Sequence, residues 1–143
     1  MRLKRLVVEA LERLGAQVED VGPADETSVD YPDYARRVAE AVRDGRADRG
    51  VLVCGTGIGM SIAANKVAGV RAALVRDSDD AKMSRLHNDA NVLVLGGNLS
   101  DVDEVNRVIE VWWTTAFEGG RHAKRVAKIS EIERANRRGG KRR

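Results

Sequence analysis

The sequence predicts an α/β fold in which helices cover both faces of a parallel sheet. Short apolar runs of strand length alternate along the chain with segments whose apolar residues recur at helical spacing. Most connections between them are short, and right-handed crossovers place the helices of such a chain on both faces of the sheet. The expected architecture is therefore a Rossmann-like three-layer α/β/α sandwich with four parallel strands.

Helical spacing and turn residues set the expected bounds of the elements. The first helix follows from apolar residues that recur every three or four positions from Leu3 to Leu14, with Gly15 as a natural end. The apolar run 51–53 predicts the centre of a buried strand, and Pro32 marks the approach to the second helix. We expect helices at 2–14, 33–43, 58–67, 77–87, 101–116 and 120–136, and strands at 17–21, 49–54, 72–75 and 91–95.

Length and composition predict one domain without a membrane span. The chain has 143 residues, of which 43% are hydrophobic and 33% charged, and no apolar run approaches the roughly 20 residues of a membrane helix. Its single cysteine rules out an internal disulfide, so we expect a cytoplasmic protein. We place the domain at 1–136 and a basic, disordered tail at 137–143.

The net charge of +3 comes from the tail. The last ten residues hold six of the 25 lysines and arginines and no acidic residue, so the preceding body has a small excess of acidic residues. Only 3% of the residues are aromatic, which leaves few side chains on which bases could stack. A nucleic-acid partner held by the tail is an alternative, but these features favour a protein without a specific nucleic-acid partner.

The segment CGTGIGMS, residues 54–61, is the most informative stretch of the chain. It follows the apolar run 51–53 and precedes a helical segment, so it predicts a glycine turn with the only thiol at the end of a strand. Glycines let a ligand approach the backbone, and the N–H groups at a helix start favour an anion. A tight turn around a small core cysteine is the alternative interpretation of Cys54. The candidate residues are Cys54, Gly55, Thr56, Gly57, Ile58 and Gly59.

Two nucleotide-binding motifs fit this loop poorly. Gly55 and Gly57 match the first two glycines of G-x-G-x-x-G, but Met60 occupies the position of the third. The cysteine has no role in such a dinucleotide site. A Walker A loop is excluded because no Gly-Lys-Ser/Thr follows, so we expect no nucleotide cofactor.

Two further segments supply candidate residues. His87 and Asn88 end a helix, and we expect them at the strand end next to the cysteine loop, where a histidine could move protons; a cap on the helix dipole is the alternative. Arg121 and Arg125 share a face at the start of the last helix and could clamp a phosphate; a solvated basic face is the alternative. Together, thiol, histidine, amide and guanidinium groups indicate proton transfer on a phosphorylated small molecule.

Four stretches in the same order resemble the ribose-5-phosphate isomerase B family. They are VDYPDYA at 29–35, CGTGIGMSIAANK at 54–66, SRLHNDANVL at 84–93 and FEGGRH at 117–122. The similarity extends over most of the chain, and motifs of this length in this order are highly specific. The resemblance implies the same three-layer fold.

The resemblance also implies an activity: interconversion of ribose 5-phosphate and ribulose 5-phosphate through an enediolate, without a metal or cofactor. Members form dimers and tetramers with active sites shared between subunits, so the implied partners are a phosphorylated sugar and further copies of the chain. By resemblance Cys54 is the base, assisted by Thr56, and His87 opens the sugar ring as an acid. The other implied roles are oxyanion binding by the N–H groups of 55–59, enediolate binding by Asn88, and phosphate binding by Arg121 and Arg125.

The sequence departs from the family pattern near its start and at one later position. Members open with a strand and a Gly-x-Asp-His-x-Gly turn, but Met1 stands where that motif ends, so we expect four strands where the family has five. A misplaced start codon is the expected reason, and a true truncation is the alternative. Asn98 stands where many members have an arginine. His87 argues against the galactose-6-phosphate isomerase branch, which lacks it. The alternatives are an isomerase of another phosphorylated sugar, such as galactose 6-phosphate or allose 6-phosphate, or a catalytically impaired sugar-phosphate-binding protein.

Overall fold

The computed structural model of the protein describes residues 2–25 and 28–140. Parallel strands form the centre of the molecule. The strands lie in the order β1-β3-β2, and the register pairs Val51 with Leu93 and Leu74 with Val94. The described helices are α1 (Arg2–Arg13), α2 (Tyr31–Arg43), α3 (Ile58–Ala64), α4 (Ser78–Leu86), α5 (Val102–Thr114) and α6 (Arg121–Gly140). The described strands are β1 (Gly50–Cys54), β2 (Ala72–Val75) and β3 (Val92–Gly96).

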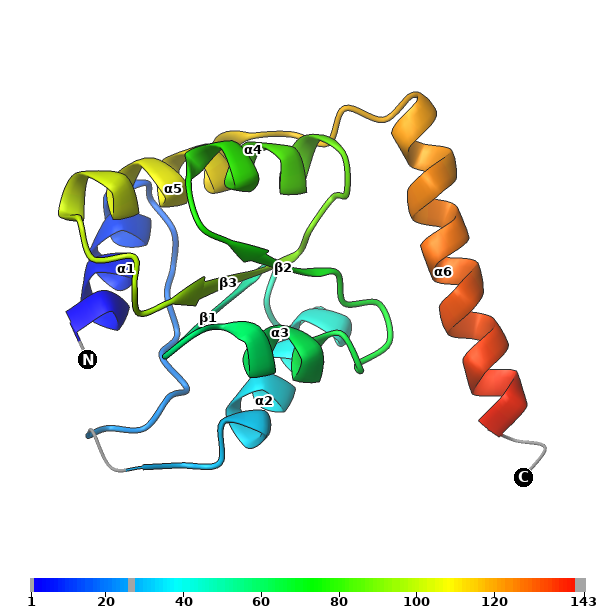
Figure 1. The fold of residues 1–143 in the computed structure, drawn as a ribbon, viewed down its shortest axis with the longest axis horizontal. Coiled ribbons are helices and arrows are strands. Elements are labelled where there is room, and N and C mark those ends of the chain that lie inside the picture. Colours follow the sequence, from blue (N-terminus) through cyan, green and yellow to red (C-terminus); the bar gives the residue numbers. More distant parts are fainter. Residues whose placement is uncertain (1, 26–27, 141–143) are drawn as a thin grey trace.

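The central strand, β3, is buried along its whole length and separates two hydrophobic clusters. Leu93 and Leu95 belong to the cluster under α1, α4 and α5, whereas Val92 and Val94 belong to the cluster with α2 and α3. Alternate residues of a strand point to opposite faces, so a continuous apolar run is what a doubly covered strand requires. Figure 1 shows these two helical layers on either side of the sheet, which confirms the predicted three-layer sandwich.

Helix α5 anchors one of the two layers. Its N-cap residue, Asp101, accepts hydrogen bonds from the backbone N–H groups of Asp103 and Glu104. Trp112 near its other end is fully buried. The guanidinium of Arg49 lies 5.2 Å from the Trp112 ring and donates to the Trp112 carbonyl over 2.8 Å, so it closes the carboxyl end of the helix.

The predicted strand at 17–21 is wrong, and the described sheet has three strands instead of the four expected. The segment has no regular secondary structure and pairs with no strand in the described part of the chain; its local contacts include a hydrogen bond from the Gly22 N–H to the Asp20 carboxylate. Val18 packs against the cluster under α1 and α5, which accounts for its apolar character. Sequence alternation reports burial of one face, whereas a strand also needs a neighbour for its backbone hydrogen bonds.

Several helix bounds differ from the sequence-based ones by a few residues. Helix α2 starts two residues early, after the N-cap Asp30, and α5 ends at Thr114 instead of 116. Helix α3 ends at Ala64 instead of 67 because Asn65 leaves the helix. The Asn65 side chain exchanges two hydrogen bonds with the backbone of Ala72, at 3.0 and 2.9 Å, and so joins the end of α3 to the start of β2.

Helix α6 projects from the sandwich as a separate arm (Figure 1). Among its contacts with the body is a hydrogen bond of 2.7 Å from the Gly69 N–H to the Glu133 carboxylate. The helix continues to Gly140, so residues 137–140 of the expected tail are helical, and residues 141–143 lie outside the described residues. Among the described helices, none is both long enough and apolar enough to cross a bilayer.

Candidate active site

Cys54 lies at the carboxyl end of β1, where the chain turns into α3. The backbone N–H of Gly57 donates a hydrogen bond to the Cys54 sulfur over 3.2 Å, a contact suited to an anionic acceptor. Gly57 has a φ of 78°, and a β-carbon there would lie 2.5 Å from the Leu74 side chain. The positive φ therefore favours glycine at this position, and a larger residue would also have to displace the Leu74 side chain.

The remaining candidates of the loop lie in the same turn as the thiol. The Ile58 N–H donates to the Thr56 hydroxyl over 3.2 Å, which fixes the hydroxyl beside the start of α3. A β-carbon on Gly59 would clash with the ring of Tyr31, so this aromatic side chain packs directly on the loop. The structure thus brings together all the loop residues that the sequence singled out, 54–59.

The turn after β3 is hydrogen-bonded to the cysteine loop. The Gly97 N–H donates to the carbonyls of Cys54 and Gly55, both at 2.9 Å. A β-carbon on Gly96 would lie 2.8 Å from the Thr56 carbonyl oxygen. The two glycines therefore allow two backbone segments to touch, and this contact fixes the position of the cysteine loop relative to the sheet.

His87 and Asn88 lie at the opposite end of the sheet from Cys54, at the carboxyl end of α4. His87 is the C-cap residue, and its N–H donates to the Met83 carbonyl over 2.9 Å. Asp89 follows in the left-handed region with a φ of 48°. The Arg71 guanidinium donates to the carbonyls of Asn88 and Asp89 at 3.2 and 3.0 Å, which holds the turn against the start of β2.

A buried arginine fixes this turn from within. Only 6% of Arg85 is exposed, and its guanidinium donates to the carbonyls of Thr115 and Ala90 and to the Asp89 carboxylate. The distances are 3.1, 2.7 and 3.0 Å. Because a buried arginine needs such partners, Arg85 ties the end of α4 to the segment that leads into α6.

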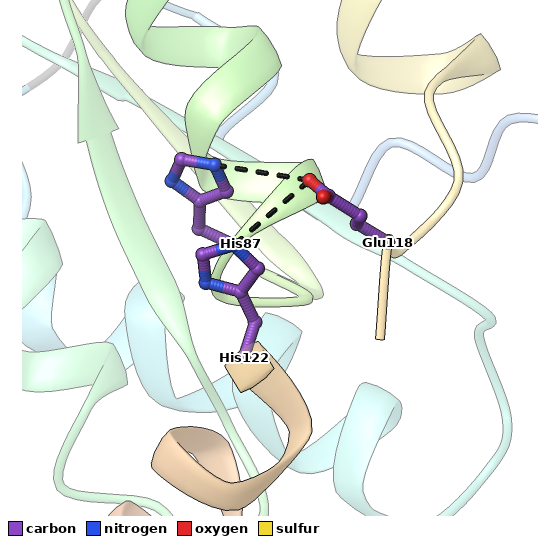
Figure 2. A group of neighbouring side chains, drawn as sticks. All are labelled: His87, Glu118 and His122. Carbon is purple, nitrogen blue, oxygen red and sulfur yellow. Dashed lines mark ion pairs between the residues drawn. The ribbon is translucent and has the colours of Figure 1, made fainter. Parts of the chain in front are cut away.

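Two imidazole rings and a carboxylate meet at this turn (Figure 2). The rings of His87 and His122 are stacked with centroids 4.0 Å apart and an interplanar angle of 12°. The Glu118 carboxylate lies 3.9 Å from the Nε2 atom of each ring. Burial lowers the pKa of His122, and the neighbouring His87 lowers it further, while Glu118 acts in the opposite direction.

Arg121 and Arg125 extend this group along α6. Both side chains are exposed, and their spacing of four residues places them on one face of the helix. His122 lies between them in sequence but is 5% exposed, because its ring packs against His87. The expected phosphate clamp thus adjoins the histidine pair and not the cysteine loop.

The sequence predicts His87 next to the cysteine loop, and for two residues of the same chain this prediction is wrong. Cys54 pairs with Gly96 at the carboxyl end of the sheet, whereas His87 precedes β3 at its amino end. Helix α4 causes this separation, because it starts after the carboxyl end of β2 and runs back along the sheet. At about 3.3 Å per residue, the five residues of β3 place the two groups more than about 13 Å apart.

Comparison with known proteins decides the family. The sequence model described as Ribose/Galactose Isomerase matches residues 1–129. The chain belongs to the ribose/galactose isomerase family. It is 44% identical to Ribose-5-phosphate isomerase B of Escherichia coli over 131 residues, covering 92% of this chain and 88% of the relative.

Solved structures of the family agree with the fold described above. Ribose-5-Phosphate Isomerase B of Clostridium thermocellum superposes with a TM-score of 0.90 at 50% identity, covering 94% of this chain and 91% of that one. The enzyme of Mycoplasma genitalium, solved with bound ribulose-5-phosphate, gives a TM-score of 0.87 at 39% identity and covers 94% and 90%. Membership of this family makes the chain an isomerase with the Rossmann-like fold.

Three residues of this isomerase were missed by the sequence analysis. Glu118 and His122 stand in the quoted motif FEGGRH, but only its arginine was given a role. Their proximity to His87 depends on a hydrogen bond of 3.1 Å from the Glu118 N–H to the Leu86 carbonyl, which no sequence pattern reveals. Arg85 could have been suspected, since an arginine two residues before a helix-terminal histidine is placed to cap the same turn.

Proposed function

We propose that this isomerase interconverts ribose 5-phosphate and ribulose 5-phosphate in the cytoplasm, with Cys54 as the base. The observation that carries this proposal is the thiol at the carboxyl end of β1, which faces the Gly57 N–H at 3.2 Å within a glycine loop. Ligands of open parallel α/β sheets bind outside the carboxyl ends of the strands. Relatives named ribose-5-phosphate isomerase B, at 44% and 50% identity, support the substrate.

The reaction moves one proton from C2 to C1 of the open-chain sugar and a second proton from O2 to O1. The Cys54 thiolate takes the proton from C2 of the aldose, the electron pair of that C–H bond forms the C1–C2 double bond of the enediolate, and the electrons of the C1 carbonyl move onto O1. The proton of the C2 hydroxyl passes to O1, the thiol returns its proton to C1, and the electron pair on O2 forms the carbonyl at C2. Backbone N–H groups of Gly55, Gly57, Ile58 and Gly59 bind the oxyanion, and Thr56 assists the thiol. This chemistry uses no metal or other cofactor.

We further propose that each site is built from two copies of the chain. His87, Asn88, Arg121 and Arg125 lie at the opposite end of the sheet from Cys54, so one chain alone cannot place all of them on one pentose. A second copy supplies them: His87 opens the furanose ring as an acid, and Asn88 holds the enediolate. The exposed apolar residues of the α6 arm, Ile129 and Ile132, support contact with another copy.

A substrate panel tests the proposed reaction. We expect ribose 5-phosphate to give the highest kcat/KM, with galactose 6-phosphate and allose 6-phosphate at least about tenfold lower, since each extra group must fit the same site. Activity should persist in the presence of a chelator. Absence of turnover on ribose 5-phosphate, or a clear preference for a hexose phosphate, would contradict the assignment.

Replacing Arg125 by alanine should weaken binding of phosphorylated sugars by roughly ten- to hundredfold, because a charge-assisted hydrogen bond to the phosphate is lost. The KM for ribose 5-phosphate and the inhibition constant of inorganic phosphate report this loss. Lys128→Ala is the matched control, since it removes another exposed positive charge from α6. Equal effects of the two variants would mean that Arg125 contributes only to the general charge of the helix.

Replacing Gly96 by alanine should lower kcat/KM by up to about a hundredfold, because the new β-carbon displaces the cysteine loop. The clash arises at the Thr56 carbonyl oxygen, 2.8 Å away, and a backbone group cannot move aside without its loop. Gly97→Ala is the control: its β-carbon would lie 3.5 Å from the nearest atom, the Gly55 carbonyl oxygen, which is ordinary contact. If both variants turn over substrate at the same rate, the contact between Gly96 and the cysteine loop does not matter for catalysis.

A further inference from the structure

The group formed by His87, Glu118 and His122 contains an unused ligand atom. The Nε2 atom of His122 is buried and has no hydrogen-bond partner in the described part of the chain. The nearest acidic oxygen, on Glu118, is 3.9 Å away and therefore too distant for a hydrogen bond. Buried polar atoms in proteins almost always have a binding partner. The His122 Nε2 atom therefore indicates a bound group that does not belong to the described residues of the protein.

The same space is bounded by two more potential ligand atoms. One ring nitrogen each of His87 and His122 and a carboxylate oxygen of Glu118 form a group whose atoms are all within 4.8 Å of one another. The Nε2 atom of each ring lies 3.9 Å from that carboxylate. Figure 2 shows both rings turned toward the carboxylate. Two imidazoles and one carboxylate are a ligand set that binds zinc with the fourth position open.

The geometry of the backbone holds these ligands in place and leaves the carboxylate free to adjust. The Glu118 N–H is bound to the Leu86 carbonyl at 3.1 Å, which keeps the residue beside His87. Gly119 and Gly120 follow with φ values of 73° and 55°, so the chain turns sharply and brings His122 back over the His87 ring.

We propose that His87, Glu118 and His122 form a site for one divalent transition-metal ion per chain, with zinc as the natural occupant and inhibition as the consequence. Metal–ligand bonds of about 2.0–2.2 Å place the ligand atoms of a tetrahedral site about 3.3 Å apart. The two distances of 3.9 Å from Glu118 must therefore contract by about half an ångström, which the exposed glutamate side chain can supply. The two histidine nitrogens approach each other by rotation of the stacked rings.

Inhibition follows because a metal-bound Nε2 of His87 can no longer act as an acid. This consequence rests on the proposed function, in which His87 opens the sugar ring. Metal binding itself does not depend on that role. The isomerase would thus lose activity when free zinc rises and regain it when a chelator removes the ion.

Direct binding is the primary test. The whole protein, freed of metal with a chelator, is titrated with Zn²⁺ by calorimetry and with Co²⁺ by visible absorption, which reports a tetrahedral site. We expect one ion per chain and a loss of affinity of at least about tenfold in His122→Gln and in Glu118→Gln. The second variant changes an exposed side chain, so it tests the site even if the first fails to fold.

Two further variants serve as controls. Glu110→Gln removes an exposed carboxylate elsewhere on the chain and should leave binding unchanged. Cys54→Ala should also retain one ion per chain, because His87, Glu118 and His122 come from one chain and the thiol is not part of their ligand set. No binding at millimolar Zn²⁺, or affinity that falls in Cys54→Ala but not in Glu118→Gln, overturns the proposed site.

Activity measurements then separate the two proposals. Zn²⁺ should inhibit ribose 5-phosphate turnover, and Glu118→Gln should raise the inhibiting concentration by about the same factor as the dissociation constant. If Zn²⁺ binds but does not inhibit, the metal site stands and the role of His87 as the acid fails. If the chelated enzyme turns over substrate normally but binds no Zn²⁺, the proposed function stands and the metal site fails.

Discussion

We expect that replacing Cys54 by alanine lowers the turnover of ribose 5-phosphate by about a hundred- to ten-thousandfold, the range that a general base contributes. No other thiol exists in the chain that could take over the proton transfer. The thiol packs only at the margin of the cluster around α2 and α3, so its removal should leave the melting temperature nearly unchanged. Turnover and thermal unfolding are measured on the same preparation.

Two measurements make this result specific to the base. Exchange of the substrate C2 proton with solvent reports the first proton transfer alone and should disappear together with turnover. Cys54→Ser keeps the size and hydrogen-bonding capacity of the side chain, but a hydroxyl is a far weaker base at neutral pH, so it should fail as well. Exchange at the wild-type rate in Cys54→Ala would refute the assignment of the base.

The loop around Cys54 could be predicted from the sequence because its determinants are local. A strand, a left-handed glycine and a helix start follow one another within a few residues, and each has its own signature in the chain. The glycine at position 57 is needed for its φ of 78°, and the structure places it as the pattern predicts. Local chemistry and local conformation agree here, so sequence reasoning succeeds.

The position of His87 could not be predicted in the same way because it depends on the direction of α4. The sequence identified the helix and the histidine at its end, but the distance to Cys54 depends on which end of the sheet that helix reaches. The strand expected at 17–21 failed for a related reason. Its Val18 is apolar because it packs under α1 and α5, and that pattern resembles a strand whether or not a neighbouring strand exists.

The separation of Cys54 and His87 leads to the second large effect, which appears only when two inactive variants are combined. Cys54→Ala and His87→Ala should each be nearly inactive alone. In a dimer with shared sites, a mixed pair contains one site with both alanines and one site with both natural residues. Random pairing of equal amounts makes half of all dimers mixed, so the mixture should regain about a quarter of the wild-type activity.

The experiment is done by producing both variants together, or by unfolding and refolding them as a mixture, so that chains exchange freely. A mixture of Cys54→Ala with Cys54→Ser is the matched control: both changes lie in the same half of the site, so no pairing creates an intact one. Arg125→Ala with Cys54→Ala should behave like the complementary pair, because Arg125 lies on the His87 side of the molecule. If the turnover of every mixture equals only the summed residual turnover of its two variants, each chain carries a complete site. Some other residue must then perform the acid step that is assigned here to the His87 of a second copy.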